Sequence, residues 1–157
     1  MKVLIIFDSI FGNTEKIAQA IGNRIRQTEE VEVFRVSEIK PEQLRGVDLL
    51  VCGSPTRGFR PTPAMVDFLK TLPANSLKNV RTASFDTRLS LPDIESSAVR
   101  FIVKTGGYAA KRISDHLKKK GAILIKPPEG FLVTSEEGPL KEGELERATE
   151  WAKSLLV

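Results

Sequence analysis

With 157 residues, the chain is long enough for one domain with a hydrophobic core and too short for two domains of ordinary size. A composition of 41% apolar and 28% charged residues excludes an intrinsically disordered chain, and no apolar run approaches the roughly 18 residues of a membrane-spanning helix. Cys52 is the only cysteine, which excludes an internal disulfide and a metal site built from cysteines. We therefore expect a soluble, cytoplasmic protein with one domain over residues 1–157.

The formal net charge of +4 is spread unevenly along the chain. Residues 104–126 hold seven basic side chains and one acidic one, whereas residues 127–157 hold seven acidic and three basic ones. A basic helix can attract nucleic acid, acidic lipid or an acidic protein. It can equally be a solvated surface whose lysines lie near the helix C-terminus, where they suit the helix dipole. We favour the solvated surface and expect no nucleic-acid partner.

Strand and helix patterns alternate along the chain. Lys2–Phe7 is a nearly continuous apolar run, typical of a strand buried on both faces, and it is too short for the apolar core of a signal peptide. In Thr62-Pro63, a capping residue precedes the residue favoured at the first helical position. In chain order the patterns predict a strand over 2–7, a helix over 13–28, strands over 31–36 and 47–53, a helix from Pro63, a strand over 80–85, a helix over 108–120, a strand over 122–125 continued by 131–133, and a terminal helix from 145 to 155.

Five strands that alternate with helices imply an α/β fold, with a parallel sheet and right-handed crossovers. The segment from Leu89 to Gly107 is the least clear part of the chain. Residues 94–105 are apolar enough for a helix that Gly106-Gly107 would end. The same segment could instead cover a ligand, contact a second copy of the chain or pack within the domain.

The loop after the first strand has the composition of an anion site. It precedes a helix, whose N-terminus offers unpaired N–H groups and the positive end of a dipole. Two hydroxyls and one amide add donors, a glycine permits a close turn, and no lysine or arginine is present. Neutral donors favour a phosphate monoester that stays bound, although the same residues could simply form a turn and a helix cap. The loop reads Ser9-Ile10-Phe11-Gly12-Asn13-Thr14.

Two further loops should reach the same edge of the sheet, where ligands of open parallel sheets bind. One follows the third strand and contains an aromatic residue, Phe59, and the other follows the fourth strand. Neither the lysine-containing phosphate loop of nucleotide triphosphatases nor the glycine pattern of dinucleotide-binding folds is present. A flat heterocycle with a phosphate tail therefore fits the three loops best.

These motifs resemble those of the flavodoxin family. The loop from Ser9 to Thr14 looks like the flavodoxin phosphate signature, with Phe11 where a hydroxyl residue is usual, and it is similar to the version in flavodiiron proteins. The run Pro55-Thr56-Arg57 resembles the flavin loop of flavodoxin-like quinone reductases. Residues 137–148 look like the ending of small prokaryotic flavodoxin-domain proteins. The resemblance implies a flavodoxin-like three-layer sandwich whose five-stranded parallel sheet has the order 2-1-3-4-5.

The resemblance also implies a binding site for flavin mononucleotide (FMN). The loop from Ser9 to Thr14 would bind the phosphate. Flavodoxins often stack a tyrosine from the third loop on the flavin, but Tyr108, the only tyrosine here, lies well beyond that loop. We therefore expect Phe59 to carry most of the stacking unless Tyr108 folds back onto the site. The isoalloxazine ring would be lined by Pro55, Thr56, Arg57, Gly58 and Phe59 from the second loop, and by Asp86, Thr87 and Arg88 from the third.

The function implied is electron transfer to redox partner proteins, with an acidic partner favoured by the basic helix. An FMN-dependent oxidoreductase of the quinone or protoporphyrinogen type is an alternative, as is a flavodoxin-like regulatory module without flavin. Positive charge from Arg57, Arg60 and Arg88 should stabilise the reduced flavin and make its potential less negative than in acidic flavodoxins. His116 and Cys52 have no partner in the sequence that would indicate catalysis. The oligomeric state is left open.

Overall fold

The computed structural model describes residues 1–90, 96–98 and 107–157. The helix predicted over 94–105 lies largely outside these residues. Within them, no helix is long and apolar enough to cross a membrane.

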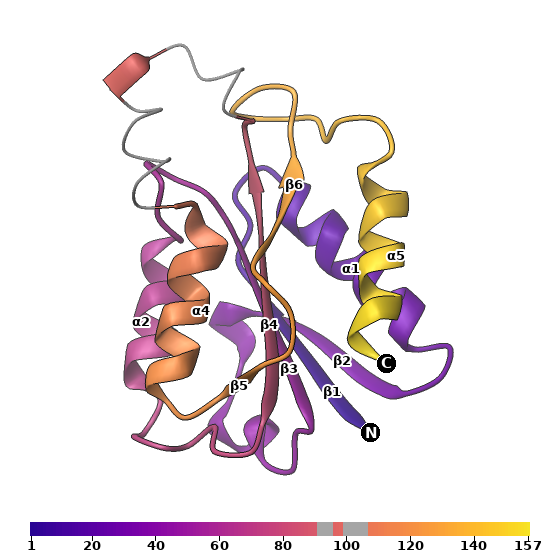
Figure 1. Ribbon diagram of the computed structural model, residues 1–157, viewed down its shortest axis with the longest axis vertical. Helices are drawn as coiled ribbons and strands as arrows, with labels where there is room; N and C mark the ends of the chain where they lie inside the picture. The colour runs from indigo at the N-terminus through magenta and orange to yellow at the C-terminus, as the bar shows by residue number, and fades with distance from the viewer. Residues whose placement is uncertain (91–95, 99–106) are drawn as a thin grey trace.

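A parallel sheet in the order β2-β1-β3-β4-β5 forms the centre of the molecule (Figure 1), which confirms the predicted fold class. The fifth predicted strand is divided into β5 and β6, which pair with the first and last residues of β4 respectively. Pro127 and Pro128 lie between the two pieces, where prolines cannot donate the hydrogen bonds of a central strand. The strands are β1 Lys2–Phe7, β2 Glu30–Arg35, β3 Leu49–Pro55, β4 Arg81–Arg88, β5 Ile123–Leu124 and β6 Glu129–Leu132.

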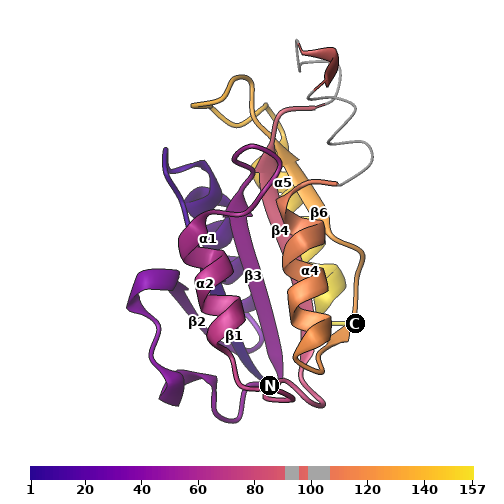
Figure 2. The same ribbon diagram turned by 90° about the vertical axis from the view of Figure 1, so that its left-hand side faces the viewer.

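Helices cover both faces of the sheet. Figure 2 shows α2 and α4 side by side on one face, and α1 packs against α5 on the other (Figure 1). The cap predicted at Thr62 is present, because its Oγ1 accepts a hydrogen bond from the Met65 N–H at 3.3 Å. The helices are α1 Asn13–Ile25, α2 Pro63–Thr71, α4 Ala109–Lys119 and α5 Glu144–Leu155, with short 3₁₀ turns η1 Val36–Glu38 and η2 Pro41–Leu44.

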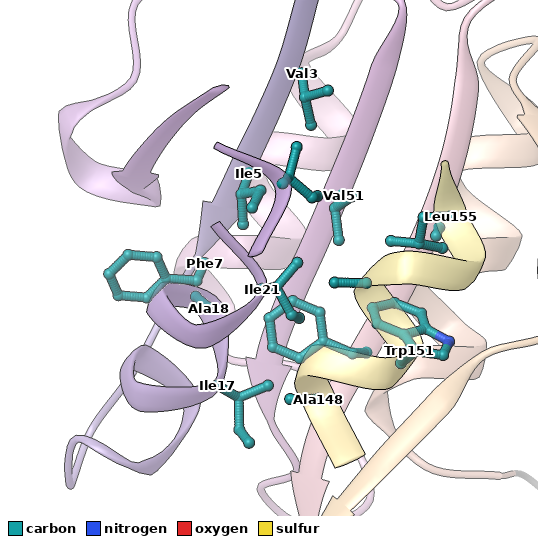
Figure 3. Close-up of a cluster of buried hydrophobic side chains, with 14 of the residues drawn as sticks. Val3, Ile5, Phe7, Ile17, Ala18, Ile21, Val51, Ala148, Trp151 and Leu155 are labelled. Atoms are coloured by element: carbon teal, nitrogen blue, oxygen red, sulfur yellow. The ribbon is translucent and has the colours of Figure 1, made fainter. Parts of the chain in front are cut away.

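Alternating residues of the buried strands divide the core into two layers. Val3, Ile5 and Phe7 of β1 pack with α1 and α5 (Figure 3), whereas Leu4 and Ile6 pack with α2 and α4. In the first layer three aromatic rings pack edge to face with centroids 6.0 to 6.1 Å apart, which adds to the stabilisation from their burial. The three rings belong to Phe85, Phe131 and Trp151.

Cys52 lies in the second layer and is fully buried, as expected for a small core residue. Burial raises the pKa of its thiol to about 12. Since the thiolate is the reactive form, we expect a thiol reagent at pH 8 to label the folded protein at least about a thousandfold more slowly than the unfolded chain. Labelling measured along a urea titration should follow the loss of circular dichroism. Rapid labelling without denaturant would contradict this burial.

Candidate functional site

A cavity of about 390 Å³ opens at the carboxyl edge of the sheet, between the ends of β1, β3 and β4. These strands are parallel neighbours, so the loops that follow them leave the sheet at the same edge. The cavity is lined by all the residues predicted for the site except Gly12 and Asp86. Its walls comprise Ser9, Ile10, Phe11, Asn13, Thr14, Pro55, Thr56, Arg57, Gly58, Phe59, Thr87, Arg88, Leu89, Tyr108, Val133 and Glu136.

The loop before α1 presents the start of that helix to the cavity. Gly12 precedes the helix with a φ of 93°, a left-handed conformation that favours glycine. The hydroxyl oxygen of Ser9 accepts hydrogen bonds from the N–H groups of Gly12 (3.2 Å) and Glu15 (3.3 Å). In the part of the chain that the structure describes, the N–H groups of Asn13 and Thr14 meet no acceptor. Two donors at a positive helix end are therefore available to an anion.

Side chains behind the loop hold it against the sheet. The Asp8 carboxylate accepts hydrogen bonds from the Ser9 N–H at 2.9 Å and from the Thr62 hydroxyl at 2.5 Å. Arg35, at the end of β2, donates to the Ser9 carbonyl oxygen at 2.9 Å. The sequence did not single out Arg35 or Asp8 for this role, because their contacts depend on how β1 and β2 pair.

Two contacts connect the loop to distant segments. The hydroxyls of Thr14 and Thr87 are 2.8 Å apart and fully or nearly buried, which joins the start of α1 to the end of β4. The Asn13 side-chain amide donates to the Glu137 carbonyl oxygen at 3.1 Å. These contacts use one hydroxyl hydrogen of the threonine pair and one hydrogen of the Asn13 amide. The Ser9 hydroxyl accepts two hydrogen bonds and keeps its own hydrogen, so it is a donor beside the backbone N–H groups of Asn13 and Thr14.

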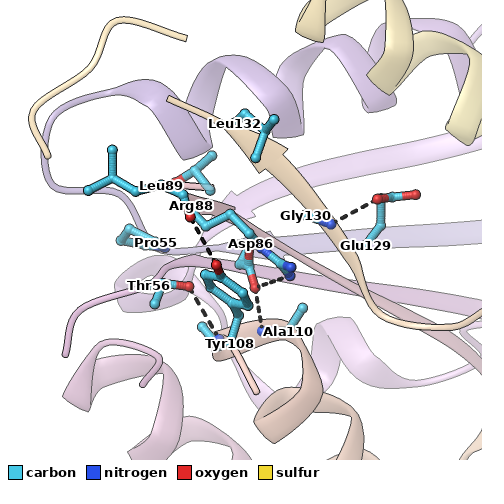
Figure 4. Close-up of polar contacts among 12 residues, drawn as sticks. Pro55, Thr56, Asp86, Arg88, Leu89, Tyr108, Ala110, Glu129, Gly130 and Leu132 are labelled. Atoms are coloured by element: carbon cyan, nitrogen blue, oxygen red, sulfur yellow. Dashed lines mark hydrogen bonds and ion pairs between the residues drawn. The ribbon is translucent and has the colours of Figure 1, made fainter. Parts of the chain in front are cut away.

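Asp86 lies beneath the cavity wall and is not exposed at all. Its carboxylate accepts two hydrogen bonds from Arg88, at 2.6 and 2.8 Å, and one from the Ala110 N–H at the start of α4, at 2.8 Å (Figure 4). Burial raises the pKa of Asp86, and the contacts with Arg88, Ala110 and Thr56 oppose that rise. Asp86 thus anchors Arg88 and α4, rather than facing a ligand as its place in the third loop suggested.

Tyr108 forms part of the cavity wall, although in the sequence it lies well beyond the third loop. It is the residue that precedes the first turn of α4, and its hydroxyl donates to the Leu89 carbonyl oxygen at 3.1 Å. The Arg88 guanidinium lies 3.8 Å from the centre of its ring, within the range of a cation–π contact. Arg88 and Tyr108 both line the cavity. Phe59 is therefore not the only aromatic residue that a flat ligand could stack on.

The arginines expected to bring free positive charge to the cavity are largely compensated. Arg88 is paired with Asp86, and Arg57 lies 3.5 Å from Glu136. Arg57 also lies over the ring of Phe11, with 5.5 Å between guanidinium and ring centre. Among the described residues, Arg60 has no acidic partner. The positive field at the cavity is therefore weaker than the count of arginines indicates.

Four cavity residues were not expected: Leu89, Tyr108, Val133 and Glu136. Leu89 belongs to the third loop, but the other three residues come from outside the three predicted loops. Tyr108 lies at the start of α4, and Val133 and Glu136 follow β6, and both segments fold back over the cavity. His116 lies further along α4, where burial and the charges of Lys119 and Lys70 lower its pKa. Among the described residues, no cluster of acidic, histidine or cysteine side chains could hold a metal ion.

The family model of flavodoxins matches residues 5–151 of this chain. A flavodoxin from Picosynechococcus sp. is 42% identical over 55 residues, a stretch that covers 35% of this chain and 32% of that protein. This chain thus aligns with about a third of that relative's length.

Solved structures resemble the chain over nearly all of its length. Oxidised flavodoxin 1 from Bacillus cereus has a TM-score of 0.76 at 21% identity, covering 99% of this chain and 97% of that one. A flavodoxin from the domain Archaea has a TM-score of 0.78 at 20% identity, with coverage of 99% and 96%. A flavodiiron core from Synechocystis sp. has a TM-score of 0.72 at 18% identity, covering 99% of this chain and 35% of that one. At these identities the structural likeness shows the fold.

Gly130 of β6 makes room for the guanidinium of Arg88. A Cβ at this position would lie 2.1 Å from Cζ of Arg88, whose side chain is held by Asp86. We expect Gly130→Ala to destabilise the protein by about 1–3 kcal/mol, because it displaces the guanidinium from the buried carboxylate. Urea unfolding measures this free energy.

The matched control places Gly130→Ala in an Arg88→Ala background, where the methyl group has space. In that background Gly130→Ala should lower the free energy of unfolding by less than about 0.5 kcal/mol. An equal loss in both backgrounds would show that the alanine disturbs β6 itself and not the ion pair.

Proposed function

The chain belongs to the flavodoxin family, and from this premise we propose that it binds FMN in the cavity and carries electrons between redox partner proteins. The observation that supports the proposal most directly is a helix start whose Asn13 and Thr14 N–H groups meet no acceptor among the described residues, next to an aromatic-walled cavity of about 390 Å³. This volume falls in the range of small-molecule sites. Bound FMN would supply one- and two-electron chemistry, which the surrounding protein tunes.

The loop of Ser9 to Thr14 fits the phosphate of FMN. The N–H groups of Asn13 and Thr14 are available as donors, and the hydroxyl of Ser9 fixes the loop by accepting from Gly12 and Glu15. No basic side chain belongs to the loop. The resulting anion site depends on backbone N–H groups, the Ser9 hydroxyl hydrogen and the helix dipole, which suits a ligand that stays bound through the redox cycle.

The remaining walls fit a flat ring system. Phe59 and Tyr108 provide aromatic surface, and the backbone from Pro55 to Gly58 provides polar groups for the edge of a heterocycle. Arg112 donates to the Phe59 carbonyl oxygen at 3.1 Å and so fixes that loop on α4. These residues would hold the isoalloxazine ring and exclude water from its faces.

The charge near the cavity bears on the partner. The lysines of 118–120 lie at the C-terminal end of α4, whereas its first residue, Ala109, contacts Thr56 beside the cavity. A partner that docks on these lysines would be a helix length away from the flavin. We therefore propose that Arg60, which follows Phe59 in the chain, and Arg112, which donates to the Phe59 carbonyl oxygen, select an acidic partner surface beside the cavity.

The proposal is tested by adding FMN to the purified protein, removing the excess and recording the visible spectrum. We expect one FMN per chain, with flavin fluorescence quenched by the aromatic walls. A protein that stays colourless in a large excess of FMN would instead support a regulatory module without flavin.

Turnover measurements on the FMN-loaded protein distinguish an electron carrier from an enzyme. A carrier accepts electrons from a reductase or a chemical reductant and passes them on, with negligible steady turnover of NAD(P)H and a quinone. Sustained turnover of those two substrates without another protein would contradict the carrier and favour the quinone-reductase alternative.

A further inference from the structure

Arg35 connects the edge strand β2 to the proposed phosphate loop. Its Nη1 donates to the carbonyl oxygen of Ser9 at 2.9 Å and lies 3.4 Å from the Asp8 carboxylate. Its Nη2 lies 3.3 Å from the carboxylate of Glu15 in the first turn of α1. The guanidinium also stands over the ring of Phe7, 5.2 Å from the ring centre. One side chain therefore contacts the residues before, within and after the loop.

These contacts fix the geometry of the loop. Arg35 holds the carbonyl oxygen of Ser9, and the hydroxyl of Ser9 in turn accepts from the N–H groups of Gly12 and Glu15. The orientation of the neighbouring donors at Asn13 and Thr14 follows from that of Gly12 and Glu15. A displacement of Ser9 would thus move the donors that an anion needs.

The same contacts reduce the negative charge next to the proposed phosphate site. Asp8 and Glu15 place two carboxylates next to a site proposed for a doubly charged phosphate, and the loop itself has no cation. Like charges beside the site would weaken anion binding. The Arg35 side chain is one-third exposed and touches both carboxylates, so it offsets part of their repulsion from a position outside the loop.

We propose that Arg35 is a positioning residue that makes the loop selective for the phosphorylated flavin over riboflavin. The inference rests on the proposed function. Arg35 makes polar contacts with Ser9, Asp8 and Glu15 around the proposed phosphate site. It does not line the cavity, so it would not touch the flavin ring. Its effect should therefore be confined to ligands that carry a phosphate.

The test is the affinity for FMN and for riboflavin, measured by flavin fluorescence quenching in wild type and in Arg35→Gln. We expect about a tenfold weaker FMN affinity and a riboflavin affinity unchanged within about twofold. Arg26→Gln is the matched control, because Arg26 is exposed and contacts Asn23 at the far end of α1. It removes the same charge and should leave both affinities unchanged.

Two further variants distinguish a specific effect on phosphate binding from a general folding defect. Arg35→Lys keeps the charge, so its preference for FMN over riboflavin should lie between those of wild type and Arg35→Gln. Adding Glu15→Gln to Arg35→Gln removes one carboxylate and should restore the part of the lost FMN affinity that comes from its repulsion, whereas the loss caused by the missing Ser9 contact should remain.

An unchanged preference for FMN in both Arg35 variants, or equal losses for FMN and riboflavin, would overturn the inference. If wild type bound neither flavin, the proposed function would fail first, so the two failures are distinguishable.

Discussion

The parallel pairing of β1, β3 and β4 is the constraint on which the site depends. Because the three strands are neighbours that run in one direction, their following loops emerge together and enclose the cavity. The helix α1 then starts at the end of β1, so its N–H groups face the same space. A swapped or reversed strand would separate the anion site from the aromatic walls.

Two carboxylates at the ends of strands organise the loops, and each is held by an arginine. Asp8 after β1 binds the Ser9 N–H, Thr62 and Arg35, and it fixes the proposed phosphate loop. Asp86 in β4 binds Arg88 and the start of α4, and it thereby positions Tyr108 on the cavity wall. Breaking the Asp86–Arg88 pair would be costly, because Asp86 is fully buried and its charge would be left without compensation.

The apolar pattern of the sequence predicted the alternation of strands and helices, and the composition of the loop before α1 predicted an anion site. The strand order and most of the residues that line the cavity followed from the resemblance to flavodoxins. Asp86 was misplaced because β4 continues to Arg88. Along a strand side chains alternate, so Thr87 meets Thr14 on one face, whereas Asp86 and Arg88 turn to α4 on the other. Tyr108 could not be placed, since its position depends on how the chain returns to α4.

The most direct test of the account is a titration of the ¹⁵N-labelled protein with FMN, followed by two-dimensional NMR. If FMN binds with its phosphate at the start of α1, the amide signals of residues 12–15 should shift most, with ring-current shifts at residues 56–59 and at Tyr108. Binding of FMN that leaves the amides of Asn13 and Thr14 unshifted would contradict the account.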